Sequence, residues 1–369
     1  MIKYLDLKQI NEPYEHAADE VLQCGWYLRG EATARFEQSY ADYIGTRHAI
    51  GCGNGLDALT LILRAYKELG VMRDGDEVIV PANTYIASIL AITECGLKPV
   101  LVEPSWETLQ IDDALIEQHI TPLTRAIMIV HLYGRCAYTD RIGNICRSRG
   151  LKLIEDNAQA HGCFAPHPSG GRGARTGALG DAAAHSFYPT KNLGAMGDAG
   201  AVTTDNDALA ETVRRLGNYG SSRKYVFSYI GRNSRMDEIQ AAILSAKLPN
   251  LDRDNDRRRQ IALRYLQGIS NTQVRIPVSH ADSVYHIFPV FCSEREQLQT
   301  WLSEQGIGTE IHYPIPPHRQ QCYAEWNGMS LPVTERIHAE ELSLPCHPAL
   351  TDAEVDTVID AVNRFSCNS

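Results

Sequence analysis

The sequence lacks the features of a membrane or nucleic-acid-binding protein. The longest apolar run, near residues 85–93, is too short and too interrupted to span a bilayer. Positive charge is also scarce, because 45 acidic residues outnumber 35 basic ones and give a formal net charge of -10. We therefore expect no membrane partner and no nucleic-acid partner, although a local basic pocket for a small phosphorylated substrate is compatible with this balance.

Cysteine spacing typical of a metal site is absent too. The ten cysteines are scattered along 369 residues and form no Cys-x-x-Cys pair. We expect no metal site, and we interpret the cysteines as reduced, small apolar side chains of a cytoplasmic protein. The first six residues contain no apolar core of a secretory signal, which favours the same location.

What the sequence does contain is an alternation of strand-like and helix-like segments. Strands are expected at 48–50, 77–80, 99–102, 126–130 and 151–154. Helices are expected at 32–44, 56–66, 84–94, 112–120 and 140–148. This order predicts an α/β fold with a large, mostly parallel sheet, covered by helices on both faces and binding its ligand at the carboxyl ends of the strands.

The pattern changes after residue 250. A charge-dense segment, 252–259, predicts an exposed linker helix, because runs of mixed charge usually lie on solvated faces. The remainder combines a strand and two helices, expected at 284–291, 296–305 and 352–365. We therefore predict a large α/β domain over 1–250 and a smaller α+β domain over 251–369. Two polar stretches of the first domain, 166–180 and 218–225, are expected to be surface loops.

One stretch, Ser-Phe-Tyr-Pro-Thr-Lys-Asn-Leu-Gly at 186–194, places a lysine just after a strand. The small apolar residues before it predict a strand that ends at Phe187, because Pro189 cannot continue a ladder. Lys191 then lies on a loop among apolar neighbours, where a lysine has a lowered pKa and acts as a nucleophile that forms a Schiff base with an aldehyde. A solvated surface lysine is the alternative.

A second strand end carries the glycine-rich stretch 51–55, directly before a helix. Free backbone N–H groups and the helix dipole favour a phosphate there. The dinucleotide pattern G-x-G-x-x-G is incomplete, because Leu56 occupies its third glycine position. A phosphate loop of another kind fits better, and a plain glycine-rich turn is the alternative.

A third strand end carries Asp156, within the stretch 155–161. An acid at this position is either a site residue or the N-cap of a helix. A lysine, a carboxylate and a phosphate-binding helix start are the groups that pyridoxal phosphate needs, because they bind its aldehyde, its ring nitrogen and its phosphate. Tyr85, at the start of another helix, is a candidate to stack on the ring.

At this point the sequence resembles the sugar aminotransferases of the DegT/DnrJ/EryC1/StrS family, within the fold-type-I pyridoxal phosphate enzymes. The resemblance covers nearly the whole chain. The matching segments are 53–59, 75–85, 155–161, 186–194, 233–238 and 312–314. It implies a fold-type-I aminotransferase with pyridoxal 5'-phosphate as its cofactor, working as a homodimer with shared active sites.

The resemblance also implies roles for individual residues. Lys191 would be the Schiff-base lysine and proton shuttle. Asp156 would pair with the pyridine nitrogen, and Gln159 would contact the ring hydroxyl. The phosphate would be bound by Ser186, by the backbone of Gly55 and Leu56, and by Asn233 of the partner subunit.

Several residues are expected to face the sugar, namely His161, Tyr188, Tyr313 and Arg223. Arg223 belongs to a basic cluster with Lys224, Arg232 and Arg235, and arginine suits the bidentate recognition of a diphosphate. Solvated loop charges are the alternative interpretation of this cluster.

The resemblance is closest to the 3-aminotransferase branch of the family. It implies transfer of an amino group from glutamate to carbon 3 of a nucleotide-linked, dTDP-bound 3-oxo-6-deoxyhexose, which gives a 3-amino sugar for glycan biosynthesis. Amination at carbon 4 of a dTDP- or UDP-linked 4-oxo-6-deoxyhexose is the main alternative. A sugar dehydratase of the family carries histidine where this chain has Lys191, and a dinucleotide-dependent oxidoreductase is disfavoured by Leu56. A regulator without catalysis would need a DNA-binding module, and none is recognisable.

The chain departs from the family pattern at three places. Ala199 stands where glycine is frequent, and His185 stands where an apolar or aromatic residue is usual. The loop 166–173 is longer than expected. None of these departures removes a catalytic group, and the roles of His185 and of this loop are not assigned by the sequence.

Overall fold

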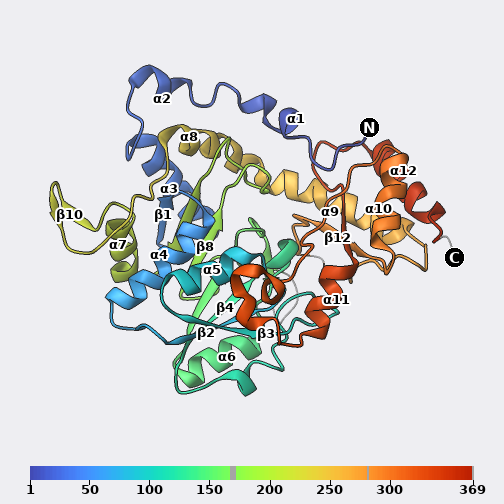
Figure 1. The fold of residues 1–369 in the computed structure, drawn as a ribbon. Helices are drawn as coiled ribbons and strands as arrows, with labels where there is room; N and C mark the ends of the chain where they lie inside the picture. Colours follow the sequence, from blue (N-terminus) through green and yellow to red (C-terminus); the bar gives the residue numbers. More distant parts are fainter. Residues whose placement is uncertain (167–171, 281, 368–369) are drawn as a thin grey trace.

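The computed structural model describes residues 1–166, 172–280 and 282–367, and a sheet of seven strands forms its centre (Figure 1). The strands lie in the order β1 (His48–Cys52), β9 (Gly200–Thr204), β8 (Ala182–Ser186), β5 (Lys152–Asp156), β4 (Thr124–Val130), β2 (Glu77–Pro81) and β3 (Lys98–Val102). Neighbouring strands from β8 to β3 run parallel, and β9 is antiparallel to both β8 and β1. The expected mixed, mostly parallel sheet is therefore confirmed.

Helices cover both faces of this sheet because successive strand side chains point to opposite sides. In β2, Val78 and Val80 belong to one apolar cluster, whereas Ile79 belongs to another. The first cluster includes side chains of α4 (Gly55–Glu68), α5 (Ile86–Glu94) and α7 (Asp207–Leu216), and the second includes those of α6 (Asp140–Arg149). A third cluster joins α3 (Glu31–Ile44) and α8 (Glu238–Lys247) to the segment after β8.

The C-terminal part of the chain has an apolar cluster of its own, which spans residues 261–365. It is built from α9 (Leu251–Gly268), α10 (Arg295–Glu304), α12 (Asp352–Arg364) and the antiparallel pair of β12 (Phe288–Phe291) and β13 (Glu341–Leu344). The N-terminal segment, with α1 (Leu7–Asn11) and α2 (Asp19–Cys24), runs along the outside from this part to α3 (Figure 1). A domain boundary at residue 250 stays a prediction.

Three sequence-based expectations for local structure are wrong. The helix expected at 112–120 is only the short 3-10 helix Glu117–His119, because the side chain of Asp112 accepts the N–H of Ala114 and forms a turn instead. The strand expected at 284–291 is confined to β12, where it has β13 as a partner. The charge-dense segment 252–259 is helical but not wholly exposed, since Asn255 and Arg258 of α9 are buried.

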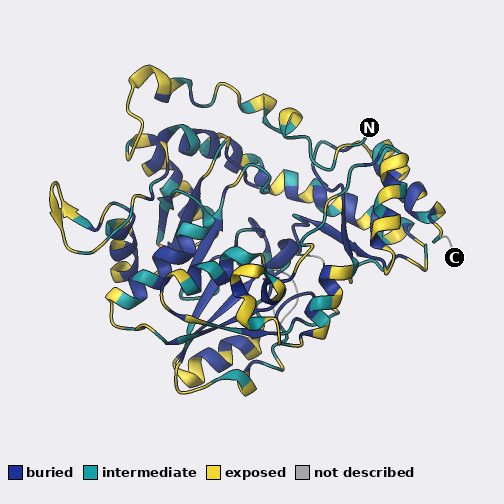
Figure 2. Ribbon diagram, viewed as in Figure 1, coloured by how far each residue is buried: buried dark blue, intermediate teal, exposed yellow. Residues whose placement is uncertain are grey.

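The two stretches expected to be loops contain short hairpins. Residues Arg172–Arg175 form β7, which pairs with β6 (Phe164–Pro166), and the following residue, Thr176, is buried. Residues Ser221–Arg223 and Val226–Phe227 form β10 and β11, a hairpin that projects from the body of the molecule and is largely exposed (Figure 2). The remainder of the loop at 166–173 lies outside the described residues. In the described part of the chain, no helix has the length and apolar character that crossing a membrane requires.

Candidate active site

A cavity of about 470 Å³ lies where the three strand ends singled out in the sequence converge. The large-sheet part of the chain contributes the start of α4, the end of β5 and the segment that follows β8. The C-terminal part contributes His286, His312 and Tyr313. Lys191 is the only lysine or arginine among the described residues that line this cavity.

The start of α4 forms an anion-binding corner of the cavity. Asn54 caps the helix, because its Oδ1 accepts the N–H of Asp57 at 2.8 Å. The N–H groups of Gly55 and Leu56, the first two residues of the helix, have no hydrogen-bond partner within the helix. A Cβ at Gly55 would lie 2.6 Å from Cβ of Ser186, so glycine allows the helix start to approach the end of β8. Free amides at a helix start suit a phosphate.

Asp156 ends β5 as a buried carboxylate, only 7% exposed. Its Oδ2 accepts the hydroxyl of Ser88 at 2.7 Å, and its Oδ1 accepts the N–H of Ala158 at 3.1 Å. Burial raises the pKa of Asp156, and these two hydrogen bonds and the charge of Lys191 oppose the rise. A buried carboxylate without an ion-pair partner among the described residues suits a protonated ring nitrogen.

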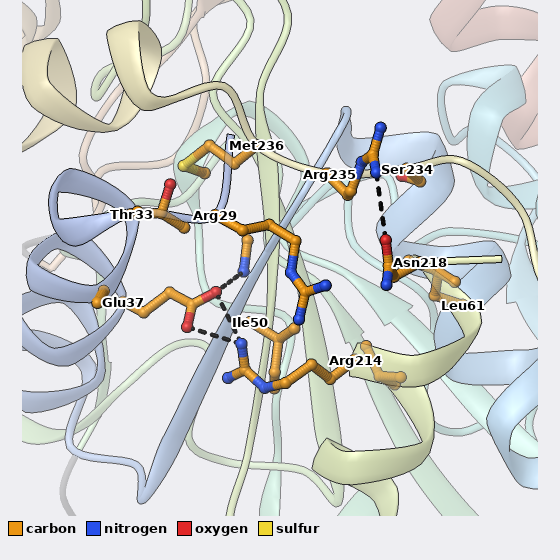
Figure 3. A pocket seen from close by; sticks show the side chains of 15 residues that line it. Arg29, Thr33, Glu37, Ile50, Leu61, Arg214, Asn218, Ser234, Arg235 and Met236 are labelled. Atoms are coloured by element: carbon orange, nitrogen blue, oxygen red, sulfur yellow. Dashed lines mark hydrogen bonds and ion pairs between the residues drawn. The ribbon is translucent and has the colours of Figure 1, made fainter. Parts of the chain in front are cut away.

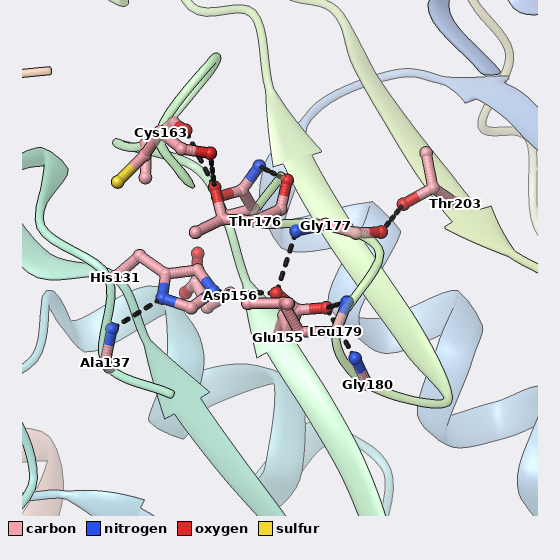
Figure 4. A network of polar contacts seen from close by, with 12 residues as sticks. His131, Ala137, Glu155, Asp156, Cys163, Thr176, Gly177, Leu179, Gly180 and Thr203 are labelled. Atoms are coloured by element: carbon pink, nitrogen blue, oxygen red, sulfur yellow. Dashed lines mark hydrogen bonds and ion pairs between the residues drawn. The ribbon is translucent and has the colours of Figure 1, made fainter. Parts of the chain in front are cut away.

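A polar network behind Asp156 fixes the end of β5 (Figure 4). Glu155 accepts Nε2–H of His131 at 2.8 Å, and the backbone N–H groups of residues 177, 179 and 180 at 2.7 to 2.8 Å. Nδ1 of His131 accepts the N–H of Ala137, so its Nε2 carries the hydrogen that Glu155 accepts. The backbone N–H of His131 donates to the carbonyl of Asp156 at 3.1 Å. This network therefore holds the backbone of Asp156 in place.

Lys191 lies in the cavity on the loop that follows β8. Its backbone N–H donates to the carbonyl of Tyr188 at 2.8 Å, which closes a tight turn. Burial lowers the pKa of Lys191 to about 8, although the nearby charge of Asp156 opposes the fall. An amine with this pKa is partly neutral near neutral pH, as a nucleophile or proton carrier must be. Lys191 is half-buried in this cavity, which disfavours the alternative of a fully solvated surface lysine.

The aromatic side of the cavity is held by Gln159. Its Nε2 donates to the hydroxyl of Tyr313 at 3.0 Å, and its Oε1 accepts the N–H of Tyr133 at 2.7 Å. The rings of Tyr313 and Tyr85 lie 5.0 Å apart at the cavity, and Tyr85 is half exposed. These two rings are the available stacking surfaces for a planar ligand.

These residues fit pyridoxal phosphate. The amides of Gly55 and Leu56 and the hydroxyl of Ser186 would hold its phosphate, and Asp156 would hold its ring nitrogen. Lys191 would bind its aldehyde, and all five of these residues line one cavity. The described residues contain no group of three or more His, Cys, Asp or Glu side chains that could hold a metal ion.

Three residues singled out in the sequence do not line this cavity. His161 is fully buried, with its ring 5.4 Å from that of Phe187, and neither of its ring nitrogens has a hydrogen-bond partner in the described part of the chain. It therefore does not face a sugar in this cavity. Arg223 lies on the projecting β10–β11 hairpin, and Asn233 is exposed near the base of that hairpin, bridged to Asn218. Tyr188, by contrast, is half exposed at the cavity.

The basic cluster around Arg223 is partly engaged within the chain. Arg232 forms ion pairs with Asp57 and Glu94, each at 3.1 Å. Arg235 donates to Asn218 at 3.2 Å. Within one chain, Arg232 and Arg235 are therefore engaged by neighbouring side chains of the same chain, and a substrate role for Arg223 stays a prediction.

A second, smaller cavity of about 150 Å³ is lined by residues of α3, α7 and the segment 234–236 (Figure 3). Four charged residues line it, namely Arg29, Glu37, Arg214 and Arg235. Glu37 accepts a hydrogen bond from Arg214 at 3.0 Å and one from the N–H of Gly51 at 2.8 Å. Ser234 connects this region to the glycine loop, because its Oγ accepts the N–H of Gly53 at 3.0 Å. These contacts fix the segment that carries Asn233.

Three polar residues of the site were missed in the sequence, namely Ser88, Asn192 and His286. Ser88 lies one turn after Tyr85 on α5, and this spacing of three would have placed both residues on one side of the helix. Asn192 is adjacent to Lys191 but has partners up to 94 residues away. His185, whose role the sequence left unassigned, is buried and bonded to Tyr40 and Thr203, each at 2.8 Å.

The sequence is similar to known aminotransferases over nearly its whole length. The model of the "DegT/DnrJ/EryC1/StrS aminotransferase family" matches residues 8–363. The chain is 52% identical to the dTDP-3-amino-3,6-dideoxy-alpha-D-galactopyranose transaminase of Aneurinibacillus thermoaerophilus, with 99% of both chains covered. It is 43% identical to the dTDP-3-amino-3,4,6-trideoxy-alpha-D-glucose transaminase of Streptomyces venezuelae, with 99% of this chain and 96% of that protein covered.

Solved structures show the same similarity. The crystal structure of S. venezuelae DesV is 43% identical to this chain, with a TM-score of 0.93 over 98% of this chain and 97% of that one. The structure of ntda from Bacillus subtilis, with bound cofactor PMP, is 31% identical, with a TM-score of 0.87 over 98% of this chain and 84% of that one.

Proposed function

The chain belongs to the DegT/DnrJ/EryC1/StrS aminotransferase family, and on this premise we propose its substrates and the residues that carry its reaction. It is a pyridoxal phosphate-dependent sugar aminotransferase with the expected α/β fold of the family. The observation that carries this function is the meeting of Lys191, Asp156 and the start of α4 on one cavity. A dinucleotide-dependent oxidoreductase, by contrast, does not need a lysine that forms a Schiff base with its cofactor.

The proposed acceptor is a dTDP-linked 3-oxo-6-deoxyhexose, which receives the amino group at carbon 3. The two relatives described above support this proposal, because both are named for dTDP-linked sugars with an amino group at carbon 3 and no hydroxyl at carbon 6. Amination at carbon 4 is not favoured by these relatives. The proposed donor is glutamate, and the proposed product is a 3-amino sugar for glycan biosynthesis.

Each proposed catalytic role follows from the position of the residue. Pyridoxal phosphate, when bound, supplies an electron sink for the carbanion formed at the reacting carbon. Asp156 keeps the ring nitrogen protonated, which the sink requires. Lys191, with its pKa lowered to about 8, accepts and returns a proton at the reacting carbon. Ser186 and the amides at the start of α4 bind the phosphate, and Gln159 orients the ring through its hydroxyl.

The charges around the cavity support a shared site. Glutamate and a nucleotide diphosphate both carry more than one negative charge, yet Lys191 is the only lysine or arginine among the described residues of the cavity wall. Asn233 and Arg223 are exposed and lie away from their own cavity. We therefore propose a homodimer in which Asn233 of the partner subunit completes the phosphate site and Arg223 of the partner subunit recognises the acidic substrate.

The proposed location is the cytoplasm. All ten cysteines are free, and a reducing compartment keeps thiols in this state.

The acceptor is tested by supplying the enzyme and glutamate with dTDP-linked 3-oxo- and 4-oxo-6-deoxyhexoses in separate reactions. Locating the new carbon–nitrogen bond by NMR should place the amine at carbon 3 of the 3-oxo sugar. An amine found at carbon 4 alone would overturn the proposed regiochemistry and leave the aminotransferase class unchanged.

A further inference from the structure

The cavity contains an imidazole to which the reaction described above gives no role. His286 precedes β12 in the chain and lines the cavity from the C-terminal part. Its Nδ1 lies 3.1 Å from Oδ1 of Asn192, the residue that follows Lys191. His286 is therefore held against the lysine-bearing loop by a contact that spans 94 residues of sequence.

The hydrogen bonds of Asn192 determine which nitrogen of His286 carries the proton. Nδ2 of Asn192 donates to Oδ1 of Asn255 at 2.8 Å and to the carbonyl of Val284 at 3.1 Å. Asn255 is itself oriented, because its Nδ2 donates to the carbonyl of His161 at 2.8 Å. Oδ1 of Asn192 is therefore the atom that faces the imidazole. Since this oxygen only accepts, Nδ1 of His286 must carry the proton.

The other ring nitrogen of His286 is an unused acceptor. Its Nε2 has no hydrogen-bond partner among the described residues, and unlike both ring nitrogens of His161 it is not sealed from the solvent. Burial and the positive charge of Lys191 lower the pKa of His286 far below its ordinary value, so the ring is neutral. Nε2 thus offers a lone pair to the cavity and carries no hydrogen.

We propose that His286 is a specificity-determining residue, whose Nε2 accepts a hydrogen bond from a hydroxyl group of the hexose on a carbon next to the ketone. This inference rests on the proposed function. The ketone carbon must approach Lys191 during amino transfer, and His286 is anchored to the residue beside that lysine. The hydroxyls that flank the ketone are the donor groups that this geometry brings nearest to Nε2.

The rest of the cavity wall makes such an acceptor selective. Apolar side chains of α4, of α5, of the end of β4 and of the segment after it line much of the cavity, namely Leu56, Leu59, Ile86, Leu90, Val130 and Leu132. A sugar that lacks the contacted hydroxyl would leave Nε2 unpaired in a site emptied of water. A site built to bind a hydroxyl rejects the analogue without it for this reason.

The two transaminase relatives suggest suitable ligands. The name of one contains a 3-amino-3,6-dideoxy sugar, which keeps the hydroxyl at carbon 4, and the name of the other contains a 3-amino-3,4,6-trideoxy sugar, which lacks it. The dTDP-linked forms of these two amino sugars, together with the 2-deoxy analogue of the first, probe each flanking hydroxyl separately. Their dissociation constants for the holoenzyme are measured by calorimetry. The wild-type enzyme should bind the ligand that keeps both flanking hydroxyls about tenfold more tightly than the analogue that lacks the hydroxyl contacted by Nε2.

Two variants of His286 then assign this preference to Nε2. In His286→Asn the amide nitrogen replaces Nδ1 and keeps the bond to Asn192, while the acceptor at Nε2 is lost. In His286→Gln the longer amide restores an acceptor near Nε2. His286→Asn should weaken the binding of the ligand with both hydroxyls about tenfold, and should leave the binding of the analogue without the contacted hydroxyl nearly unchanged. His286→Gln should recover part of the lost affinity. His119→Asn, remote from the cavity and bonded to the carbonyl of Leu115, is the matched control.

The outcomes separate the inference from the proposed function. If the wild-type enzyme neither binds nor forms these amino sugars, the proposed function is wrong. If it forms them but binds all three ligands equally, or if His286→Asn weakens the binding of all three to the same extent, the inference is overturned and the function stands. If a variant fails to fold, the affinities of the three ligands for the wild-type enzyme still test the inference.

Discussion

At the scale of single residues, the site depends on a buried carboxylate, Asp156, and a half-buried amine, Lys191, that do not form an ion pair with each other. Among the described residues, Asp156 has hydrogen bonds but no ion pair, and the amine of Lys191 has no bonded carboxylate. Both arrangements cost stability, because a buried charge loses its hydration. Such groups are retained where chemistry needs them.

The role of Asp156 predicts the effect of removing its charge. Asp156→Asn should fold normally, because an amide fills the same volume and Oδ1 can still accept the N–H of Ala158. Its turnover number should fall by about 100-fold or more, as is typical when a positioned charge is lost from an active site. Asp360→Asn, exposed on α12, is the control. Near-normal turnover of a folded Asp156→Asn enzyme would rule out the assigned role.

Lys191 predicts how the stability of the cofactor-free enzyme depends on pH. Its pKa is about 8 in the folded state and 10.5 in the reference state, so the unfolded chain binds more protons between these values. Burial of the charged amine therefore costs most below about pH 8, and this cost disappears as the pH rises towards 10.5. Lys191→Met should raise the free energy of unfolding by roughly 1 to 3 kcal/mol at pH 7.

Denaturant unfolding of the cofactor-free proteins at several pH values checks this expectation. The stability gain of Lys191→Met over wild type should shrink between pH 8 and 10.5. Lys98→Met, a substitution of an exposed lysine in β3, is the control for loss of a surface charge. A gain that stays constant with pH would show that the amine of Lys191 is not buried in its charged form.

At the scale of elements, the start of α4 positions the phosphate because it approaches the end of β8 closely. Gly55→Ala would bring a Cβ within 2.6 Å of Cβ and 3.2 Å of Cα of Ser186, so the helix start must move away. Overpacking of this kind costs about 1 to 3 kcal/mol, and fluorescence titration should show a tenfold or greater loss of affinity for pyridoxal phosphate. Gly328→Ala, which meets no atom within 4 Å, is the control. Unchanged affinity of Gly55→Ala would contradict this phosphate site.

Elements with strong local patterns could be predicted from the sequence. The helix expected at 140–148 is α6 (Asp140–Arg149), and the strand expected at 126–130 lies within β4. The helix predicted at 112–120 is wrong because the side chain of Asp112 accepts a backbone N–H, and helix propensities do not take this competing hydrogen bond into account. The hairpin of β6 and β7 was missed because a glycine-rich sequence carries little strand signal.

The site shows the same division between local and long-range information. Lys191, Asp156 and the glycine loop could be found because each directly follows a strand, and parallel strands bring their carboxyl ends together. The inward position of His161 could not be found, because it depends on packing against Phe187. The contact of His286 with Asn192 could not be predicted either, since no local sequence pattern indicates a hydrogen bond between residues 94 positions apart.

At the scale of the whole molecule, the projecting hairpin requires an explanation beyond one chain. Tyr225 and Phe227 on the hairpin and Ile230 just after it are 82%, 59% and 87% exposed, and a monomer gains nothing from exposing them. The proposed homodimer would bury this hairpin and bring its Arg223 to the partner's cavity. Sedimentation at micromolar concentration should therefore give twice the 41.0 kDa of one chain. An active species with the mass of one chain would contradict this proposal.

Shared sites make a sharper prediction for mixed dimers. Each proposed site takes Lys191 from one chain and Asn233 from the other, so Lys191→Ala and Asn233→Ala homodimers should both be impaired. Unfolding and refolding the two variants together should restore activity, because a mixed dimer contains one intact site. No gain over the separately refolded variants would show that Asn233 acts within its own chain or not at all.

The central claim is that Lys191 binds pyridoxal phosphate in the cavity at the carboxyl ends of the strands. The most direct test is borohydride reduction of the holoenzyme, followed by peptide mass spectrometry to locate the reduced cofactor. The label should lie on Lys191 in wild type and in the Lys98→Ala control, and Lys191→Ala should have no label, no visible absorbance of lysine-bound cofactor and no turnover. A reduced cofactor on any other lysine of wild type, or a labelled and active Lys191→Ala enzyme, would contradict the account.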